Sequence, residues 1–161
     1  MAAGATYEPI ATTTLGSANA SVTFSSISGS YTDLVLICSA KATSGSPVAY
    51  VRFNSDNGSN YSRRYVYGDG STVSSSRDSN ASVIDIALQS TSNFMPIVIN
   101  LNNYSNTTTY KTLLFRGGLD YPGATIALWR STNAISTVLV EVPSSTFVAG
   151  STFTLYGIAA A

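Results

Sequence analysis

The chain has 161 residues, a formal net charge of zero and no histidine, and 44% of its residues are apolar while only 10% are charged. This length is most simply one domain around a single core. A zero net charge gives no attraction to nucleic acid or anionic lipid, so we expect neither as a partner. The absence of histidine removes Ser-His and Cys-His nucleophile pairs and most zinc and copper sites.

The amino-terminal stretch from residue 2 to residue 14 is apolar but weakly periodic. Two interpretations are open for residues 1–14 of the single domain 1–161: an extended arm that reaches a neighbour, or the first strand. The stretch lacks the basic and apolar regions of a signal peptide, and no apolar run in the chain approaches the length of a membrane-spanning helix. We therefore expect the protein to fold in a cytoplasm.

Short runs rich in β-branched and aromatic residues follow one another along the chain, separated by clusters of Ser, Gly, Asn and Pro. They predict strands at 22–24, 33–40, 48–53, 61–67, 83–88, 97–101, 110–115, 124–129, 135–142 and 153–158. The Ser-rich segment 68–81 is expected to be an exposed loop. This rhythm predicts an all-β, single-domain antiparallel β-sandwich, jelly-roll-like, with about eight to ten strands.

Some of these strands are apolar on both faces. Residues 34–37 and 138–140 are apolar throughout, and strict alternation turns Trp129 away from Ile126 and Leu128. One face of a sheet in a two-layer sandwich normally meets water. We therefore expect a neighbouring subunit, a loop or a terminal arm to cover the second face of these strands.

The remaining polar residues offer little for catalysis. Four of the carboxylates lie in turn contexts, where they ordinarily cap turns: Asp56, Asp69, Asp78 and Asp120. No spacing selects a glycosidase-type pair of carboxylates. The stretch 54–60 has its glycine one position too early for a calcium loop and is expected to be a hairpin. The sequence predicts no enzyme activity, no cofactor and no metal site, and it predicts Cys38 to be a small buried hydrophobe.

Tyrosine and arginine concentrate between residues 50 and 67, and both types are enriched where proteins bind partners. Alternation places residues 61, 63, 65 and 67 on one face of a strand and residue 64 on the other. Ordinary packing within a sheet is the alternative explanation for these residues. The candidate interface or ligand-binding residues are Tyr50, Arg52, Tyr61, Arg63, Arg64, Tyr65, Tyr67 and, from a later strand, Trp129.

Short segments along nearly the whole chain together resemble small β-rich virion structural proteins of tailed bacteriophages, especially cyanophages and marine phages. The most distinctive is the closing pattern Gly-Ser-x-Phe-x-Leu-Tyr-Gly-Ile at 150–158. The other segments are 7–11, 22–27, 31–34, 52–54, 60–62, 103–104, 109–112 and 128–131.

This resemblance implies a non-enzymatic protein that is made in the host cytoplasm and assembles into the virion, commonly as a homotrimer. Within this setting, the short chain has no evident coiled coil, long fibrous shaft or repeats, which favours a capsid decoration or cement protein on the outer surface of the head, with the major capsid protein as partner. The alternative is a tail fibre or spike component that binds a host-surface glycan through exposed Tyr61, Arg63, Tyr65 and Trp129. The resemblance carries over no catalytic residue.

Overall fold

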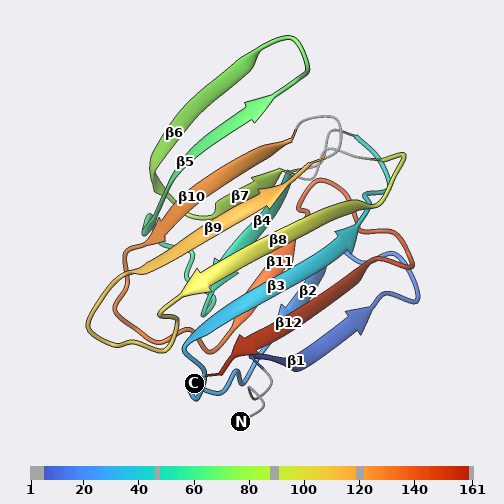
Figure 1. Cartoon of the computed structure of the whole chain (residues 1–161). Helices are drawn as coiled ribbons and strands as arrows, with labels where there is room; N and C mark the ends of the chain where they lie inside the picture. Colours follow the sequence, from blue (N-terminus) through green and yellow to red (C-terminus); the bar gives the residue numbers. More distant parts are fainter. Residues whose placement is uncertain (1–5, 46–47, 88–90, 119–121, 160–161) are drawn as a thin grey trace.

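The computed structural model describes residues 6–45, 48–87, 91–118 and 122–159, and these residues form twelve strands and no helix (Figure 1). The strands are β1 (Tyr7–Thr14), β2 (Ser21–Phe24), β3 (Asp33–Ala40), β4 (Val48–Phe53), β5 (Tyr61–Gly68), β6 (Val73–Ala81), β7 (Ile84–Ala87), β8 (Met95–Asn102), β9 (Lys111–Gly117), β10 (Gly123–Trp129), β11 (Val138–Glu141) and β12 (Thr152–Ile158). Accordingly, the described part of the chain contains no helix that is long and apolar enough to cross a membrane.

The strands form two antiparallel sheets that pack face to face as a sandwich. The large sheet has eight strands in the order β1-β12-β3-β8-β9-β10-β5-β6, and the small sheet has four in the order β2-β11-β4-β7. If the hairpins β5–β6 and β9–β10 are set aside, the remaining eight strands have the order first-eighth-third-sixth in one sheet and second-seventh-fourth-fifth in the other. This is the strand order of a jelly roll, so the predicted fold class is confirmed.

The core lies between the two sheets and is built from the alternate side chains of each strand. On the large sheet these include Leu34, Leu36, Ile99, Leu113, Phe115, Phe153 and Leu155; on the small sheet they include Val51, Phe53, Ile84, Ile86, Val138 and Val140. Each Å² of apolar surface that is removed from water stabilises the folded state by about 25 cal/mol, so this layer is the main source of stability. Cys38 is buried in it, as predicted.

All ten predicted strands are present, and two further strands are observed, of which one was an open interpretation of the sequence and the other was not predicted. The first strand is β1, which begins at Tyr7 and pairs with β12, so residues 7–14 form a strand rather than a free arm; residues 1–5 lie outside the described residues. The second is β6, in the segment that was expected to be a loop. Because β6 is an edge strand that pairs only with β5, its Ser-rich sequence needs no apolar face, and the apolar pattern that reveals a strand is missing.

The two inserted hairpins both extend the same sheet, which is therefore twice as wide as its partner. The β5–β6 hairpin projects beyond the rest of the sandwich at one edge (Figure 1). Its turn is stabilised by Asp69, whose carboxylate accepts hydrogen bonds from the backbone N–H groups of Ser71 and Thr72. At its base, Arg63 of β5 forms an ion pair with Asp85 of β7, the edge strand of the small sheet. The large sheet thus reaches past the edge of the small one.

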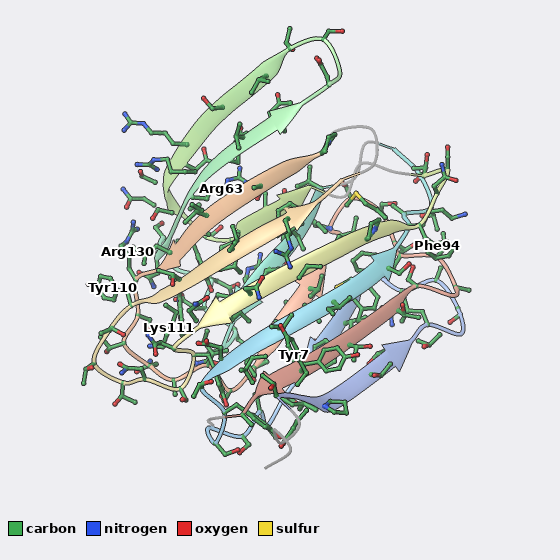
Figure 2. The ribbon with its side chains drawn as sticks, in the orientation of Figure 1. Tyr7, Arg63, Phe94, Tyr110, Lys111 and Arg130 are labelled. Atoms are coloured by element: carbon green, nitrogen blue, oxygen red, sulfur yellow. The ribbon has the colours of Figure 1, made fainter. Side chains whose placement is uncertain are left out.

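One end of the sandwich is closed by two basic side chains, labelled in Figure 2. The ammonium group of Lys111 donates to the carbonyls of Thr109 and Thr132 at 2.8 and 3.2 Å. Arg130 donates to the carbonyl of Ser59 at 2.6 Å and to the side chain of Asn80 at 2.8 Å. These contacts connect segments that are distant in sequence, so both residues have a structural role.

Candidate functional site

Two of the sequence-predicted binding residues are part of the core. Tyr61 and Trp129 are 0% and 2% exposed, and their rings pack against each other and against Phe53. Burial raises the pKa of Tyr61 to about 12. Its hydroxyl accepts a hydrogen bond from the backbone N–H of Phe53 and donates to the carbonyl of Asp56. The expectation that Tyr61 and Trp129 lie exposed for glycan binding is therefore wrong. Both rings bury their large apolar surface in the core of the sandwich instead.

Tyr50 and Arg52 lie on the outer face of the small sheet, since Ala49, Val51 and Phe53 of the same strand face the core. The Arg52 guanidinium forms a 2.6 Å ion pair with Glu141 on the neighbouring strand β11. The guanidinium is thus already engaged by a carboxylate, and both side chains of the pair are only 21% exposed. This surface therefore has no feature that distinguishes it as a site.

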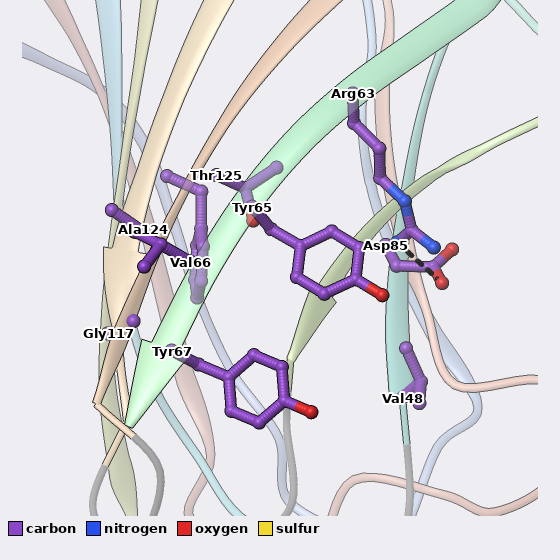
Figure 3. A pocket seen from close by; sticks show the side chains of 11 residues that line it. Val48, Arg63, Tyr65, Val66, Tyr67, Asp85, Gly117, Ala124 and Thr125 are labelled. Carbon is purple, nitrogen blue, oxygen red and sulfur yellow. Dashed lines mark ion pairs between the residues drawn. The ribbon is translucent and has the colours of Figure 1, made fainter. Parts of the chain in front are cut away.

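Arg63, Tyr65 and Tyr67 lie on the same face of β5, as alternation predicts, and Arg64 lies on the opposite face. Together with Val48, Asp85 and Thr125 the first three residues line a hollow between β5 and the edge of the small sheet, which we call the tyrosine crease (Figure 3). Its volume is about 210 Å³. The crease is the first of two surfaces on which a function can be argued.

The side chains of the tyrosine crease contact one another. The rings of Tyr65 and Tyr67 are stacked with centroids 6.0 Å apart, and the Arg63 guanidinium lies 5.2 Å from the centre of the Tyr65 ring. Arg63 also pairs with Asp78 and, at 2.5 Å, with Asp85. Burial raises the pKa of the Asp85 carboxyl despite this adjacent guanidinium. The crease therefore combines aromatic surface, an ion pair and a partly desolvated carboxylate.

The second surface is the outward face of the large sheet, which presents apolar side chains to solvent. We call it the outer sheet face and define it by Ile37, Val98, Leu114, Ile126 and Val66 together with Arg64, Arg77 and Arg116. The strand register makes these residues neighbours: Ile37 is opposite Val98, Leu114 is opposite Ile126, and Arg64 is opposite Arg77. Ile126 is 62% exposed, and Val66, Ile37 and Leu114 are 45, 43 and 38% exposed.

At one end of the same face an outward-pointing apolar side chain is buried. Val35 points outward on β3 but is only 4% exposed, and its register partner on β12 is Tyr156. The Tyr156 ring contacts Tyr7 of β1 edge to face, with centroids 6.3 Å apart. The side chains beside Val35 thus come from neighbouring strands of the same sheet, whereas Ile37 and Ile126 are 43% and 62% exposed.

The charge on the outer sheet face is one-sided. Among the described residues, Arg64, Arg77 and Arg116 have no carboxylate partner within ion-pair distance. The carboxylate that alternation places on this face of the described strands is Asp33, at the beginning of β3, where it accepts a hydrogen bond from the backbone N–H of Asn103. This face therefore presents apolar area together with unpaired positive charge.

Sequence reasoning missed the residues that complete both surfaces. Val48 and Asp85 reach the crease only because β4 and β7 belong to the other sheet, which no local pattern shows. Arg116 and Arg77 join Arg64 through strand pairing between segments distant in sequence. For the outer sheet face, the sequence did contain one signal: some strands have apolar residues on both faces, which indicates a second apolar surface.

The segment 54–60 connects β4 in the small sheet to β5 in the large one. The prediction of a hairpin at this segment is therefore wrong. The Asp56 carboxylate accepts hydrogen bonds from Trp129, Asn60 and the backbone N–H of Gly58. No cluster of three or more metal-ligating side chains occurs within the described ranges.

The chain was compared with protein-family models, curated proteins and solved structures, and none of them matches it.

Proposed function

We propose that this protein is a non-enzymatic structural component of a tailed-bacteriophage virion, and that it is a decoration or cement protein on the outer surface of the head. The observation that carries the proposal is the outer sheet face, where Ile126 is 62% exposed in the middle of a sheet strand. Contiguous exposed apolar area on a sheet commonly marks an interaction surface. The segments that resemble virion structural proteins of tailed bacteriophages support the assignment to a phage particle.

The partner in this proposal is the major capsid protein. Among the residues that the structure describes, the three arginines of the outer sheet face have no acidic partner, so this face complements an apolar capsid surface that is bordered by carboxylates. A homotrimer seated over a junction between capsid subunits would connect them and raise the free energy of rupture through binding linkage.

Binding of purified protein to capsids that lack it tests the proposal. We expect I126E and L114E to abolish binding, because each buries a new charge in the interface. T23E is the matched control: Thr23 is exposed on β2, on the outer face of the small sheet and so on the opposite side of the sandwich from the outer sheet face. Binding should also weaken with salt, since arginines contribute.

Cryo-electron microscopy of virions that contain the protein gives the second test. Many copies on the head, each with the outer sheet face toward the capsid, are expected, and virions without the protein should rupture at a lower temperature. Copies found on the tail alone, or capsid binding that I126E leaves intact, would contradict the cement role. Light scattering of the purified protein measures whether it is a trimer.

A tail fibre or spike component is the second candidate, and one observation favours it. The β5–β6 hairpin projects from the sandwich and carries Tyr65 and Tyr67 with it. Such a projection is suited to contact a host surface. Attachment of the purified protein to host cells, together with a location on the tail, would replace the head assignment.

A further inference from the structure

We propose that the tyrosine crease is a binding site for one neutral hexopyranose ring of a glycan. The aromatic side chains of this site lie on the other side of the sheet from the outer sheet face, because the strand alternation of β5 turns Tyr65 and Tyr67 to the side opposite Arg64 and Val66; Val66 is the residue that borders both surfaces. The inference therefore holds whether the domain sits on the head or on the tail, and it does not depend on capsid binding.

The size of the crease limits its ligand. Its volume of about 210 Å³ is below the range of roughly 300–1,000 Å³ typical for drug-sized ligands. A single sugar ring fits that space, whereas a dinucleotide or a folded peptide does not. The crease is also open to solvent through the exposed Tyr67, so neighbouring sugars of a chain can remain outside.

The aromatic side chains provide an apolar platform. Tyr65 is in contact with both the Arg63 guanidinium and the Tyr67 ring, so its position is fixed. Tyr67 is 39% exposed and keeps surface available for a ligand. Because one face of a pyranose consists of C–H groups, it can pack on a tyrosine ring while its hydroxyls point elsewhere. Val48 adds apolar surface on the opposite wall.

The polar groups of the crease are suited to hydroxyl groups. Within the described residues, the hydroxyls of Tyr65 and Tyr67 have no hydrogen-bond partner, and Figure 3 shows both directed toward the wall that holds Val48 and Asp85. The ion pair with Arg63 is made by one Asp85 oxygen, Oδ2. The other oxygen, Oδ1, can accept a hydrogen bond from a ligand hydroxyl.

The charges in the crease select against anions. Arg63 is already shared between Asp78 and Asp85, so no free cation remains there for a phosphate or a carboxylate. An anionic ligand would also lie beside the Asp85 carboxylate, which costs free energy. A neutral ring with hydroxyl donors and a C–H face satisfies both the aromatic platform and the acceptor oxygen.

Nuclear magnetic resonance of the full chain tests the site. The probes are methyl α-D-glucopyranoside, methyl α-D-mannopyranoside, methyl β-D-galactopyranoside and N-acetylglucosamine, each titrated into isotope-labelled protein. We expect at least one to produce saturation transfer and to shift amide signals around Val48, Tyr67, Asp85 and Thr125. Glucuronic acid, the anionic comparison, should bind more weakly.

Three variants and a control assign the binding to the crease. Y67A should weaken binding about tenfold or more, corresponding to about 1.4 kcal/mol. Y67F should lose only the hydroxyl contribution, and D85N should weaken binding while leaving the stacked rings in place. Y110A is the control, because Tyr110 is 52% exposed and immediately precedes β9, whose far end reaches the crease at Gly117.

Absence of saturation transfer from all four neutral sugars would overturn the inference, as would binding that Y67A leaves unchanged in a variant with an unaltered melting temperature. Neither result bears on the capsid role, which I126E and L114E test independently. Capsid binding lost in I126E with sugar binding retained would likewise separate the two surfaces.

Discussion

The Asp56 carboxylate accepts a 2.7 Å hydrogen bond from the indole N–H of Trp129, a core residue that is 2% exposed. The same carboxylate accepts from the Asn60 side chain at 2.9 Å and from the backbone N–H of Gly58 at 2.8 Å. One side chain thereby fixes the crossing from the small sheet to the large sheet and satisfies the buried donor of Trp129.

Replacing Asp56 should therefore destabilise the protein. D56A leaves the indole N–H without its acceptor, and we expect a loss of about 1–3 kcal/mol in the free energy of unfolding. Urea denaturation followed by fluorescence measures it, since Trp129 is the single tryptophan of the sequence. E8Q is the control, because Glu8 is an exposed carboxylate of β1. Equal stabilities of D56A and E8Q would contradict this role.

Asp56 should also make stability depend on pH. Burial raises the pKa of its carboxyl, but the hydrogen bonds from Trp129, Asn60 and Gly58 outweigh burial and hold the pKa below its ordinary value of 3.8. The folded state thus favours the ionised form, so this stabilisation is complete above that value and is lost as the pH falls through the lowered pKa. Acid denaturation followed by Trp129 fluorescence should show a smaller pH dependence in D56N.

Gly157 should be intolerant of a side chain. A Cβ atom at this position would collide with the ring of Tyr31, which packs directly on the glycine. We expect G157A to lower the free energy of unfolding by about 1–3 kcal/mol, as overpacking does in cores. G16A is the matched control, since a Cβ there would meet no atom within 4 Å.

A double mutant separates a clash from a general effect of alanine at position 157. Truncation of the ring in Y31A removes the atoms that Cβ would meet, so G157A should cost less in the Y31A background. Thermal denaturation of the four proteins in this cycle gives the coupling. Additive losses would mean that the ring of Tyr31 is not the obstacle.

Cys38 should be unreactive until the protein unfolds. Burial raises the pKa of its thiol to about 12, and only the thiolate reacts with disulfide reagents. Labelling with Ellman's reagent should therefore be slow in native buffer and fast in urea, and its rate in native buffer should follow the unfolding reaction. The sequence contains one cysteine, so the signal has a single source. Rapid labelling of the native protein would contradict the burial.

Alternation and turn residues were enough to predict ten strands and the sandwich, because most of those strands bury alternate apolar side chains along one face. β6 escaped prediction because its partner is a single strand and its side chains are Ser, Arg, Asp and Asn. β1 left two interpretations open, since its burial comes from pairing with β12, the strand at the other end of the chain. Both gaps have the same cause: edge strands are stabilised by backbone pairing that composition does not reveal.

The site was predicted only in part. Concentration of Tyr and Arg pointed to β5, and alternation separated Arg63, Tyr65 and Tyr67 from Arg64. Burial of Tyr61 could not be foreseen, because it depends on Phe53 and Trp129 from two other strands. A sequence pattern gives the face on which a side chain lies, but which face is covered is decided by the pairing of distant strands.

The position of β6 at the sheet edge has a practical consequence for engineering. Since β6 pairs only with β5 and contributes none of the buried core residues, the tip of this hairpin can accept foreign sequence without disturbing the sandwich. Gly70, with a φ of +86° and no heavy atom near its Cβ position, marks the point of insertion. A peptide inserted there would lie at the projecting end of the β5–β6 hairpin, away from the core between the two sheets (Figure 1).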